Sequence, residues 1–348
     1  MLYVGIDHHK KFCYGTVMDE KGKIQWSRKF ETKKEKVKEV FNGVGKAKAV
    51  LEAGRNWAVM YDWLEEMFEE VKLAHPLKVK AIAEAKIKND KIDSKTLAHL
   101  LRADLIPEAH VPDKETRGAK RVLRQRMFYV RLRTMVKNRI RIMLEGYPQV
   151  MEECPVKGLF TEKGMRWLKE VRLKGKDREI LDGDISMLEE LNKRIRASHS
   201  LIEKLWAEDE DARHLESIPG IGKFFAVLIS KEIEGIKRFK TEKKLASYAG
   251  LVPSTYSSGQ RTVHGKITKQ GNKWLRYALI EAVWPAIKAD GQLREYYRRL
   301  REYKSANVAK VSCARRLLKT VYKVLRKKNY HQIHRQPSFS SWLSADGR

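Results

Sequence analysis

The chain has 348 residues, which is enough for two or three domains with separate buried cores. Lysine and arginine outnumber aspartate and glutamate by 73 to 44; the net charge of +29 indicates a polyanionic partner, and a hydrophobic content of 42% argues against global disorder. No apolar run is long enough for a membrane span, and the first residues do not resemble a secretory signal. Three distant cysteines exclude a disulfide framework and a cysteine-based zinc site. We therefore expect a cytoplasmic globular protein.

Residues 1–110 alternate between strand and helix patterns. Strands are predicted over residues 2–7, 12–18, 24–31, 48–52 and 71–74. The second and third of these flank a turn at residues 19–23, so they are expected to form a hairpin. Helices are predicted over residues 33–44 and 59–69 and from residue 77 to about residue 105, with a break near residue 88. A hairpin followed by alternating helices and strands predicts an α/β domain with a mixed sheet covered by helices.

Residues 111–210 have a helical pattern throughout. One stripe of apolar residues consists of Leu132, Val136, Ile140, Met143 and Leu144. A second segment repeats apolar residues every seven positions, at Leu181, Leu188, Ile195 and Ile202. Asp184 and Ser198 interrupt the interleaved positions of this repeat. An intramolecular helical hairpin and an intermolecular coiled coil both fit the pattern, and three heptads do not decide between them.

Residues 211–335 are predicted to be mainly helical, with two segments rich in glycine. The sequence Ile-Pro-Gly-Ile-Gly at residues 218–222 resembles a helix-hairpin-helix turn, in which glycine amides such as those of Gly220 and Gly222 approach a DNA phosphate. The same pattern also occurs in plain turns between helices. Residues 250–271 are predicted to form a loop, helices follow at residues 272–289 and 308–327, and residues 336–348 are expected to form a flexible tail.

The positive charge is concentrated in the second part of the chain. Residues 1–110 contain 21 basic and 17 acidic residues, whereas residues 111–348 contain 52 and 27. Residues 117–141 contain ten basic residues and no acidic one, so a helix formed by them has no internal partners for its charges. This favours contact with a nucleic-acid backbone over a solvated face. The candidate nucleic-acid-binding side chains are Arg117, Lys120, Arg121, Arg124, Arg131, Lys137, Arg141, Lys266 and Lys269.

Four acidic residues of the first region occupy positions suited to metal binding. Asp7 and Glu52 each end a predicted strand. Asp90 and Asp93 are three residues apart, so on a helix they share one face. Four such oxygen donors can hold two Mg²⁺ ions about 3.5–4 Å apart and polarise a phosphodiester. Each residue alone also fits a turn or a solvated helix face, but their occurrence together favours a metal site.

Two histidines, His8 and His9, directly follow Asp7 and could contact a metal there. Adjacent residues of a strand point to opposite faces, so both cannot easily ligate one ion.

Several segments resemble one known family. Residues 3–10, 51–54 and 88–94 resemble the segments that carry the acidic tetrad of the DEDD transposases of insertion-sequence family 110, which are related to the Piv-type DNA invertases. In the second half, residues 215–222, 246–253, 258–259 and 265–272 resemble the carboxyl-terminal transposase domain of that family. Because these segments follow one another in the family's order over nearly the whole chain, the resemblance is more specific than any single motif.

The resemblance implies a fold and a set of catalytic residues. It implies a RuvC-like RNase H fold for residues 1–110, a basic helical or coiled-coil region for residues 111–210 and a transposase domain for residues 211–335. The Mg²⁺ ligands that it implies are Asp7, Glu52, Asp90 and Asp93. It further implies a serine nucleophile that forms a covalent phosphoserine with DNA. The position relative to Pro253 favours Ser258 for this role, with Ser257 as the alternative.

The resemblance also implies partners. Family members act on the DNA of element ends and targets, are guided by a structured noncoding RNA, and assemble as dimers or tetramers. A prokaryotic, nucleoid-associated location follows from these partners, and the charge of the second half fits both nucleic acids without distinguishing them.

Two other functions fit the same residues. One is a metal-dependent junction resolvase or nuclease with water as the nucleophile, in which Ser258 only shapes a loop. The other is a non-catalytic nucleic-acid scaffold whose acidic residues are surface groups. His264 lies six residues after Ser258 and could act as a base, although a lone histidine in a loop is more often incidental.

Overall fold

The computed structural model describes residues 1–83, 89–258 and 261–328, and the side chains of residues 256–264 lie outside this description. The tail predicted for residues 336–348 therefore falls outside the described residues. The chain divides into two compact units, Met1–Pro112 and the part from residue 113 onward.

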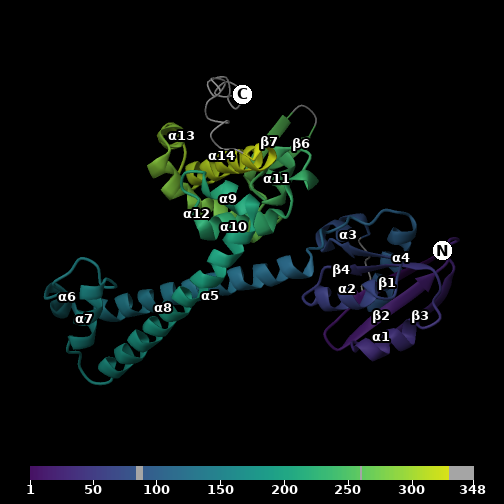
Figure 1. Cartoon of the computed structure of the whole chain (residues 1–348), viewed down its shortest axis with the longest axis horizontal. Coiled ribbons are helices and arrows are strands. Elements are labelled where there is room, and N and C mark those ends of the chain that lie inside the picture. The colour runs from purple at the N-terminus through teal and green to yellow at the C-terminus, as the bar shows by residue number, and fades with distance from the viewer. Residues whose placement is uncertain (84–88, 259–260, 329–348) are drawn as a thin grey trace. The chain divides into compact units, whose positions relative to one another are not determined.

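The first unit is built on one mixed sheet (Figure 1). Its described strands are β1 (Leu2–His8), β2 (Phe12–Met18), β3 (Ile24–Glu31), β4 (Ala47–Glu52) and β5 (Glu70–Ala74). They follow the order β3-β2-β1-β4-β5, in which β1, β4 and β5 run parallel and β2 is antiparallel to both of its neighbours. The predicted hairpin of β2 and β3 is confirmed.

Helices cover both faces of this sheet. They are α1 (Lys34–Phe41), α2 (Trp57–Glu65), α3 (Pro76–Ile82) and α4 (Asp90–Arg102). Apolar residues of α1 and α2 pack against Val4 and Ile6 of β1 in one core cluster. On the other face, Leu97 and Leu101 of α4 pack with Val50 of β4. This alternation is the one expected of a sheet buried on both faces.

The close approach of α4 to the sheet depends on Gly5 in the middle of β1. A Cβ atom at this position would lie 2.1 Å from the carbonyl oxygen of Ser94 and 2.5 Å from the amide nitrogen of Ala98. The backbone of α4 therefore occupies the space that any side chain at residue 5 would need. A strand glycine of this kind marks a site where another backbone packs closely.

The second unit is mostly helical. Its long helices are α5 (Lys114–Glu145) and α8 (Asp177–Glu208), with α6 (Pro148–Glu152) and α7 (Glu162–Glu170) between them. The remaining elements are α9 (Glu210–Glu216), α10 (Lys223–Ile233), a 3₁₀ turn at Ile236–Arg238, α11 (Glu242–Tyr248), β6 (Pro253–Ser258), β7 (Arg261–Ile267), α12 (Lys273–Ala289), α13 (Gly291–Tyr303) and α14 (Ala306–Lys327).

Helix α5 of the same chain runs beside α8 (Figure 1), and its apolar residues pack against the seven-residue repeat of α8. Ile140 and Leu144, near the end of α5, pack with Leu181 and Leu188, near the start of α8. At the other end, Leu123 of α5 belongs to one core cluster with Ile202 of α8, so the two helices are antiparallel. Of the two arrangements that fit the repeat, the structure therefore contains the intramolecular hairpin.

The prediction of an α/β region followed by a mostly helical region is confirmed. The prediction of a loop over residues 250–271 is wrong for part of that range, because β6 and β7 form an antiparallel pair there. The glycine and serine content of this segment is typical of a loop, but its β-branched and aromatic residues, such as Thr255, Tyr256, Thr262 and Val263, favour strands. Helices α11 and α13 were not predicted.

Among the described residues, no helix is both long enough and apolar enough to span a membrane.

Replacing Gly5 by alanine should force α4 away from the sheet. We expect Gly5→Ala to lower the free energy of unfolding by about 2 kcal/mol or more, since overpacking a rigid contact costs about 1–3 kcal/mol. Urea unfolding of the full chain measures this. Gly45→Ala is the matched control, because a Cβ atom there meets no described atom within 4 Å and should leave stability nearly unchanged. Equal stability of both variants would show that α4 does not pack on Gly5.

Candidate metal centre

Two of the predicted carboxylates lie at the same edge of the sheet. Strands β1 and β4 are parallel and in register, with Ile6 opposite Leu51. Asp7 and Glu52 are the next residues of these neighbouring strands. Ile6 and Leu51 point into the core under α1 and α2, so the residues that follow them point to the face covered by α4. The sheet thus presents both carboxylates to the side from which α4 approaches.

The other two carboxylates lie in the first turn of α4. Asn89 caps this helix, since its side-chain oxygen accepts a hydrogen bond of 2.9 Å from the backbone N–H of Ile92. Asp90 and Asp93 follow the cap, where the positive end of the helix dipole favours negative charge.

A buried hydroxyl pair anchors the start of α4 on the sheet. The Ser94 hydroxyl lies 2.8 Å from the hydroxyl of Thr16 on β2 and 3.0 Å from the carbonyl oxygen of Lys91. Thr16 and Ser94 are both fully buried. Because buried hydroxyls are costly without partners, these hydrogen bonds fix where the acidic turn meets the sheet.

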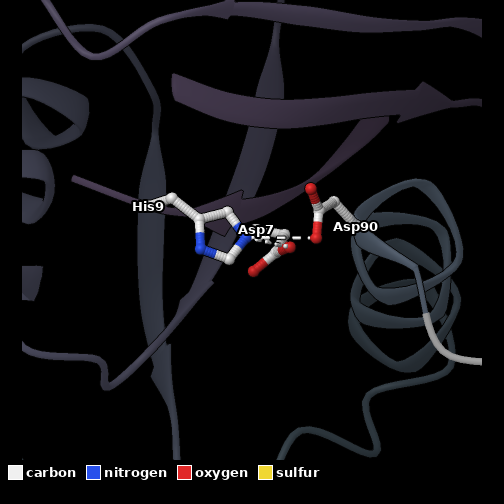
Figure 2. A group of neighbouring side chains, drawn as sticks. All are labelled: Asp7, His9 and Asp90. Carbon is white, nitrogen blue, oxygen red and sulfur yellow. Dashed lines mark hydrogen bonds and ion pairs between the residues drawn. The ribbon is translucent and has the colours of Figure 1, made fainter. Parts of the chain in front are cut away.

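His9 joins the two groups of carboxylates. Its Nε2 atom lies 3.1 Å from Oδ2 of Asp7 and 3.2 Å from Oδ1 of Asp90, as Figure 2 shows. One ligand atom from each of the three residues lies within 4.8 Å of the others. Side chains that are 81 residues apart along the chain therefore meet at one point.

Electrostatics favour a cation at this point. Burial raises the pKa of Asp7 above its ordinary value of 3.8, and the negative charges of Asp90 and Asp93 raise it further, while His9 acts in the opposite direction. A half-buried cluster of carboxylates with an imidazole is a donor set that fits a divalent cation.

Of the four predicted carboxylates, the structure brings together Asp7 and Asp90, which His9 joins. Asp93 lies in the same turn of α4 and Glu52 at the end of the neighbouring strand, and among the described residues neither belongs to this cluster. His9 was considered in the sequence only as one of a pair. The strand period of two could have identified it, because residue 9 falls on the same side as residue 7 and residue 8 on the other. Burial and the nearby charge of His9 lower the pKa of His8.

The predicted nucleophile belongs to the other unit. Ser258 ends β6, with its backbone opposite Arg261, and Ser257 lies opposite Thr262. His264 of β7 lies opposite Thr255. The side chains of both serines and of His264 are outside the described part of the chain.

Part of the basic stripe of α5 is used inside the protein. Lys120 is only 6% exposed, and its ammonium lies 3.1 Å from a carboxylate oxygen of Glu234. Arg124 donates to Glu232 over 2.8 Å. The acidic partners of these basic residues therefore lie outside α5, with Glu232 in α10 and Glu234 just after it. The sequence of α5 alone could not show this pairing.

Other basic residues of the stripe remain at the surface. Arg121, Arg131 and Arg141 are exposed, whereas Arg117 and Lys137 are half-buried. Burial lowers the pKa of Lys137, and so do the neighbouring positive charges of Arg133 and Arg141. In the C-terminal part, Lys266 on β7 and Lys269 just after it are also exposed.

The two glycines of the predicted phosphate turn have different surroundings. Gly220 has a φ of +90°, and a Cβ atom there would lie 2.3 Å from the amide nitrogen of Ala286 on α12. Its lack of a side chain therefore serves the turn and the packing of α12. Gly222 is the N-cap residue of α10, where free backbone N–H groups are available to an anion.

The sequence matches two family profiles. Residues 4–148 match a profile for DEDD transposases of the IS110 type, and residues 212–298 match the profile "Transposase IS116/IS110/IS902 family". The first match contains all four predicted carboxylates.

Curated relatives agree with these matches. The transposase for insertion sequence element IS1111A of Coxiella burnetii is 27% identical over 80% of this chain and 75% of its own length. The transposase for insertion sequence element IS1328 of Yersinia enterocolitica is 26% identical over 71% of this chain and 69% of its own length. The Sinorhizobium fredii protein y4qE is 24% identical over 67% of this chain, and the chain spans 57% of that relative's length.

The two profiles match the carboxylate-bearing unit and the C-terminal helical region in the family's order, and the chain therefore belongs to the IS110 family of DEDD transposases.

Proposed function

We propose that the chain is a DNA transposase or recombinase of an insertion sequence, which cuts and rejoins DNA strands through a covalent phosphoserine with Mg²⁺ held by its carboxylates. The observation that carries this proposal is the convergence of Asp7 and Asp90 on one point at the edge of the sheet. The strand order β3-β2-β1-β4-β5, with a carboxylate on the central strand and α4 across one face, supports a RuvC-like RNase H fold for this unit.

Each carboxylate has a definite part in this proposal. Asp7 and Glu52 approach from the sheet, while Asp90 and Asp93 approach from α4, so together they can enclose a cation from two sides. When bound, Mg²⁺ neutralises the charge of the scissile phosphate and makes a serine hydroxyl a better nucleophile. The hydrogen bonds of Asn89 and Ser94 hold the α4 carboxylates in place during this step.

The reaction conserves the energy of the phosphodiester. The Ser258 oxygen attacks phosphorus, a Ser–O–P bond forms and a P–O bond to deoxyribose breaks. The serine proton is lost and the departing deoxyribose oxygen takes up a proton, so the charge balances. In the second step a deoxyribose hydroxyl of another strand attacks the phosphoserine and releases the serine. No nucleotide cofactor is needed, because each bond that breaks is replaced by one of the same type.

The exposed basic residues support binding of DNA along α5. Arg121, Arg131 and Arg141 lie exposed on this helix, where burial and the positive charges of Arg133 and Arg141 lower the pKa of Lys137. A phosphate backbone relieves this repulsion and releases its counterions. Lys266 and Lys269, on β7 and just after it, would add contacts near the serine segment, and the Gly222 amide would add one at the start of α10. The structured guide RNA implied by the family stays a prediction, as does the nucleoid location.

Exposed apolar residues on α5 support assembly with further copies. Phe128, Met135 and Ile142 are 51%, 58% and 68% exposed and are spaced every seven residues along the helix. Such a stripe on a helix matches a coiled-coil seam. We therefore propose a dimer or tetramer, and a monomeric mass of the chain by light scattering at micromolar concentration would contradict it.

Asp7 should lower the stability of the metal-free protein. Because its pKa is raised on folding, the folded protein holds this proton more tightly than the unfolded chain does, and the ionised carboxylate destabilises the fold at neutral pH. We expect Asp7→Asn to raise the melting temperature at pH 7 in EDTA by about 2 °C. This gain should disappear as the pH falls below 3.8, where both states are protonated.

With saturating Mg²⁺, the wild type should melt at a higher temperature than Asp7→Asn. An ion that binds only the folded state stabilises the wild type by mass action, whereas Asp7→Asn lacks one of the ligands. Glu35→Gln on α1 is the control, because it removes an exposed carboxylate far along the chain from the cluster. Equal stabilisation of wild type and Asp7→Asn by Mg²⁺ would contradict the proposed metal site.

Ser258→Ala should abolish the covalent protein–DNA adduct and reduce strand exchange by at least about a hundredfold, since the nucleophile is lost. The adduct is detected as a band of slower migration on a denaturing gel with labelled DNA. Ser257→Ala is the matched control and should keep the adduct.

Loss of the adduct in Ser257→Ala alone would move the nucleophile to Ser257. Metal-dependent cleavage without an adduct in the wild type would instead support the nuclease with water as nucleophile. Binding of DNA without cleavage or exchange at any Mg²⁺ concentration would support the non-catalytic scaffold.

A further inference from the structure

We propose that His9 is a direct ligand of the divalent cation, so that this site combines a nitrogen donor with carboxylates and prefers Mn²⁺ over Mg²⁺. This inference rests on the metal site of the proposed function. It adds the imidazole nitrogen of His9 to the four carboxylates as a fifth ligand.

The ring of His9 is held in place by its surroundings. The backbone N–H of His9 donates to the carbonyl oxygen of Phe12 over 3.0 Å, and its carbonyl oxygen accepts a hydrogen bond of 2.9 Å from the Thr32 hydroxyl. The imidazole lies against the ring of Phe12, with centroids 4.9 Å apart. These contacts fix the residue just after β1 and aim Nε2 at the carboxylates (Figure 2).

The contacts of Nε2 exceed what one proton can satisfy. This nitrogen carries at most one hydrogen, yet carboxylate oxygens of Asp7 and Asp90 lie at almost equal distances of 3.1 and 3.2 Å from it. A hydrogen shared between two acceptors is poorly aligned with at least one of them. A cation that bonds to the lone pairs of all three atoms satisfies them together.

The spacing of the donor atoms also suits a small divalent ion. Neighbouring ligands of an octahedron with bonds of about 2.1 Å are about 3.0 Å apart. The separations of 3.1 and 3.2 Å are close to this value, so small shifts would convert the three hydrogen-bonded atoms into three ligands of one ion.

The donor set determines the preferred metal. Mg²⁺ prefers oxygen ligands and keeps much of its water, whereas first-row transition ions accept imidazole nitrogen readily. A site made only of carboxylates would favour Mg²⁺ chemistry. With His9 among the ligands, the affinity of the site increases more for Mn²⁺ than for Mg²⁺.

Electron spin echo spectroscopy of the full-length chain with one equivalent of Mn²⁺ tests the ligand directly, because it detects a ¹⁴N nucleus bonded to the ion. We expect ¹⁴N modulation in the wild type and none in His9→Gln. Titrations should show Mn²⁺ affinity falling about tenfold or more in His9→Gln, with a change of about twofold or less for Mg²⁺. His8→Gln is the matched control, since residue 8 points to the other face, and it should behave as the wild type. Thermal melting in EDTA verifies that each variant is folded.

Two results would overturn the inference while the proposed metal site stands. One is Mn²⁺ bound by the wild type, and lost in Asp7→Asn, without ¹⁴N modulation. The other is tighter Mn²⁺ binding by His9→Gln than by the wild type. This result would show that a positively charged imidazole pairs with the carboxylates and so competes with the metal ion. Failure of the wild type to bind Mn²⁺ at all would instead remove the metal site itself, and the inference with it.

Discussion

The candidate site depends on how closely α4 packs on the sheet. Asp7 belongs to the sheet and Asp90 to the helix, so the distance between these two elements sets how closely the two carboxylates approach. Gly5 leaves room for the helix backbone, and the buried pair of Thr16 and Ser94 fixes its position along the strand. Without this contact, Asp7 and Asp90 would be separate charges and would not form one candidate cation site.

The same contact places like charges beside one another in a half-buried position. This arrangement opposes folding in the absence of a cation, as the raised pKa of Asp7 indicates. Proteins keep such unfavourable groups where function requires them. In the described part of the second unit, the buried Lys120 is paired with Glu234 and the buried Glu232 with Arg124. The carboxylate cluster therefore differs from the structural ion pairs of the second unit, because its partial compensation by His9 leaves several acceptors facing one another.

Much of the first unit could be predicted from the sequence because its signals are local. The boundaries of β2 and β3 follow from strand alternation around a turn, and Asp7 and Glu52 could be placed at strand ends because apolar runs end there. Other features depend on distant partners and left no local signal. Lys120 looked like a free basic residue of a charged helix, but Glu234 from beyond α10 buries it. The β6–β7 pair was hidden by a glycine- and serine-rich composition. The position of His9 could be predicted only in part. The strand period indicates which face of the sheet it lies on, but only the packing of α4 shows that Asp90 lies beside it.

The central claim is that residues from the sheet and from α4 form one cation site. Anomalous diffraction at the manganese edge, from crystals of the full-length chain grown with Mn²⁺, measures the position of the ion directly. We expect a peak within bonding distance of the carboxylates of both Asp7 and Asp90. Bound manganese located elsewhere on the chain, with no peak between these two residues, would contradict the claim.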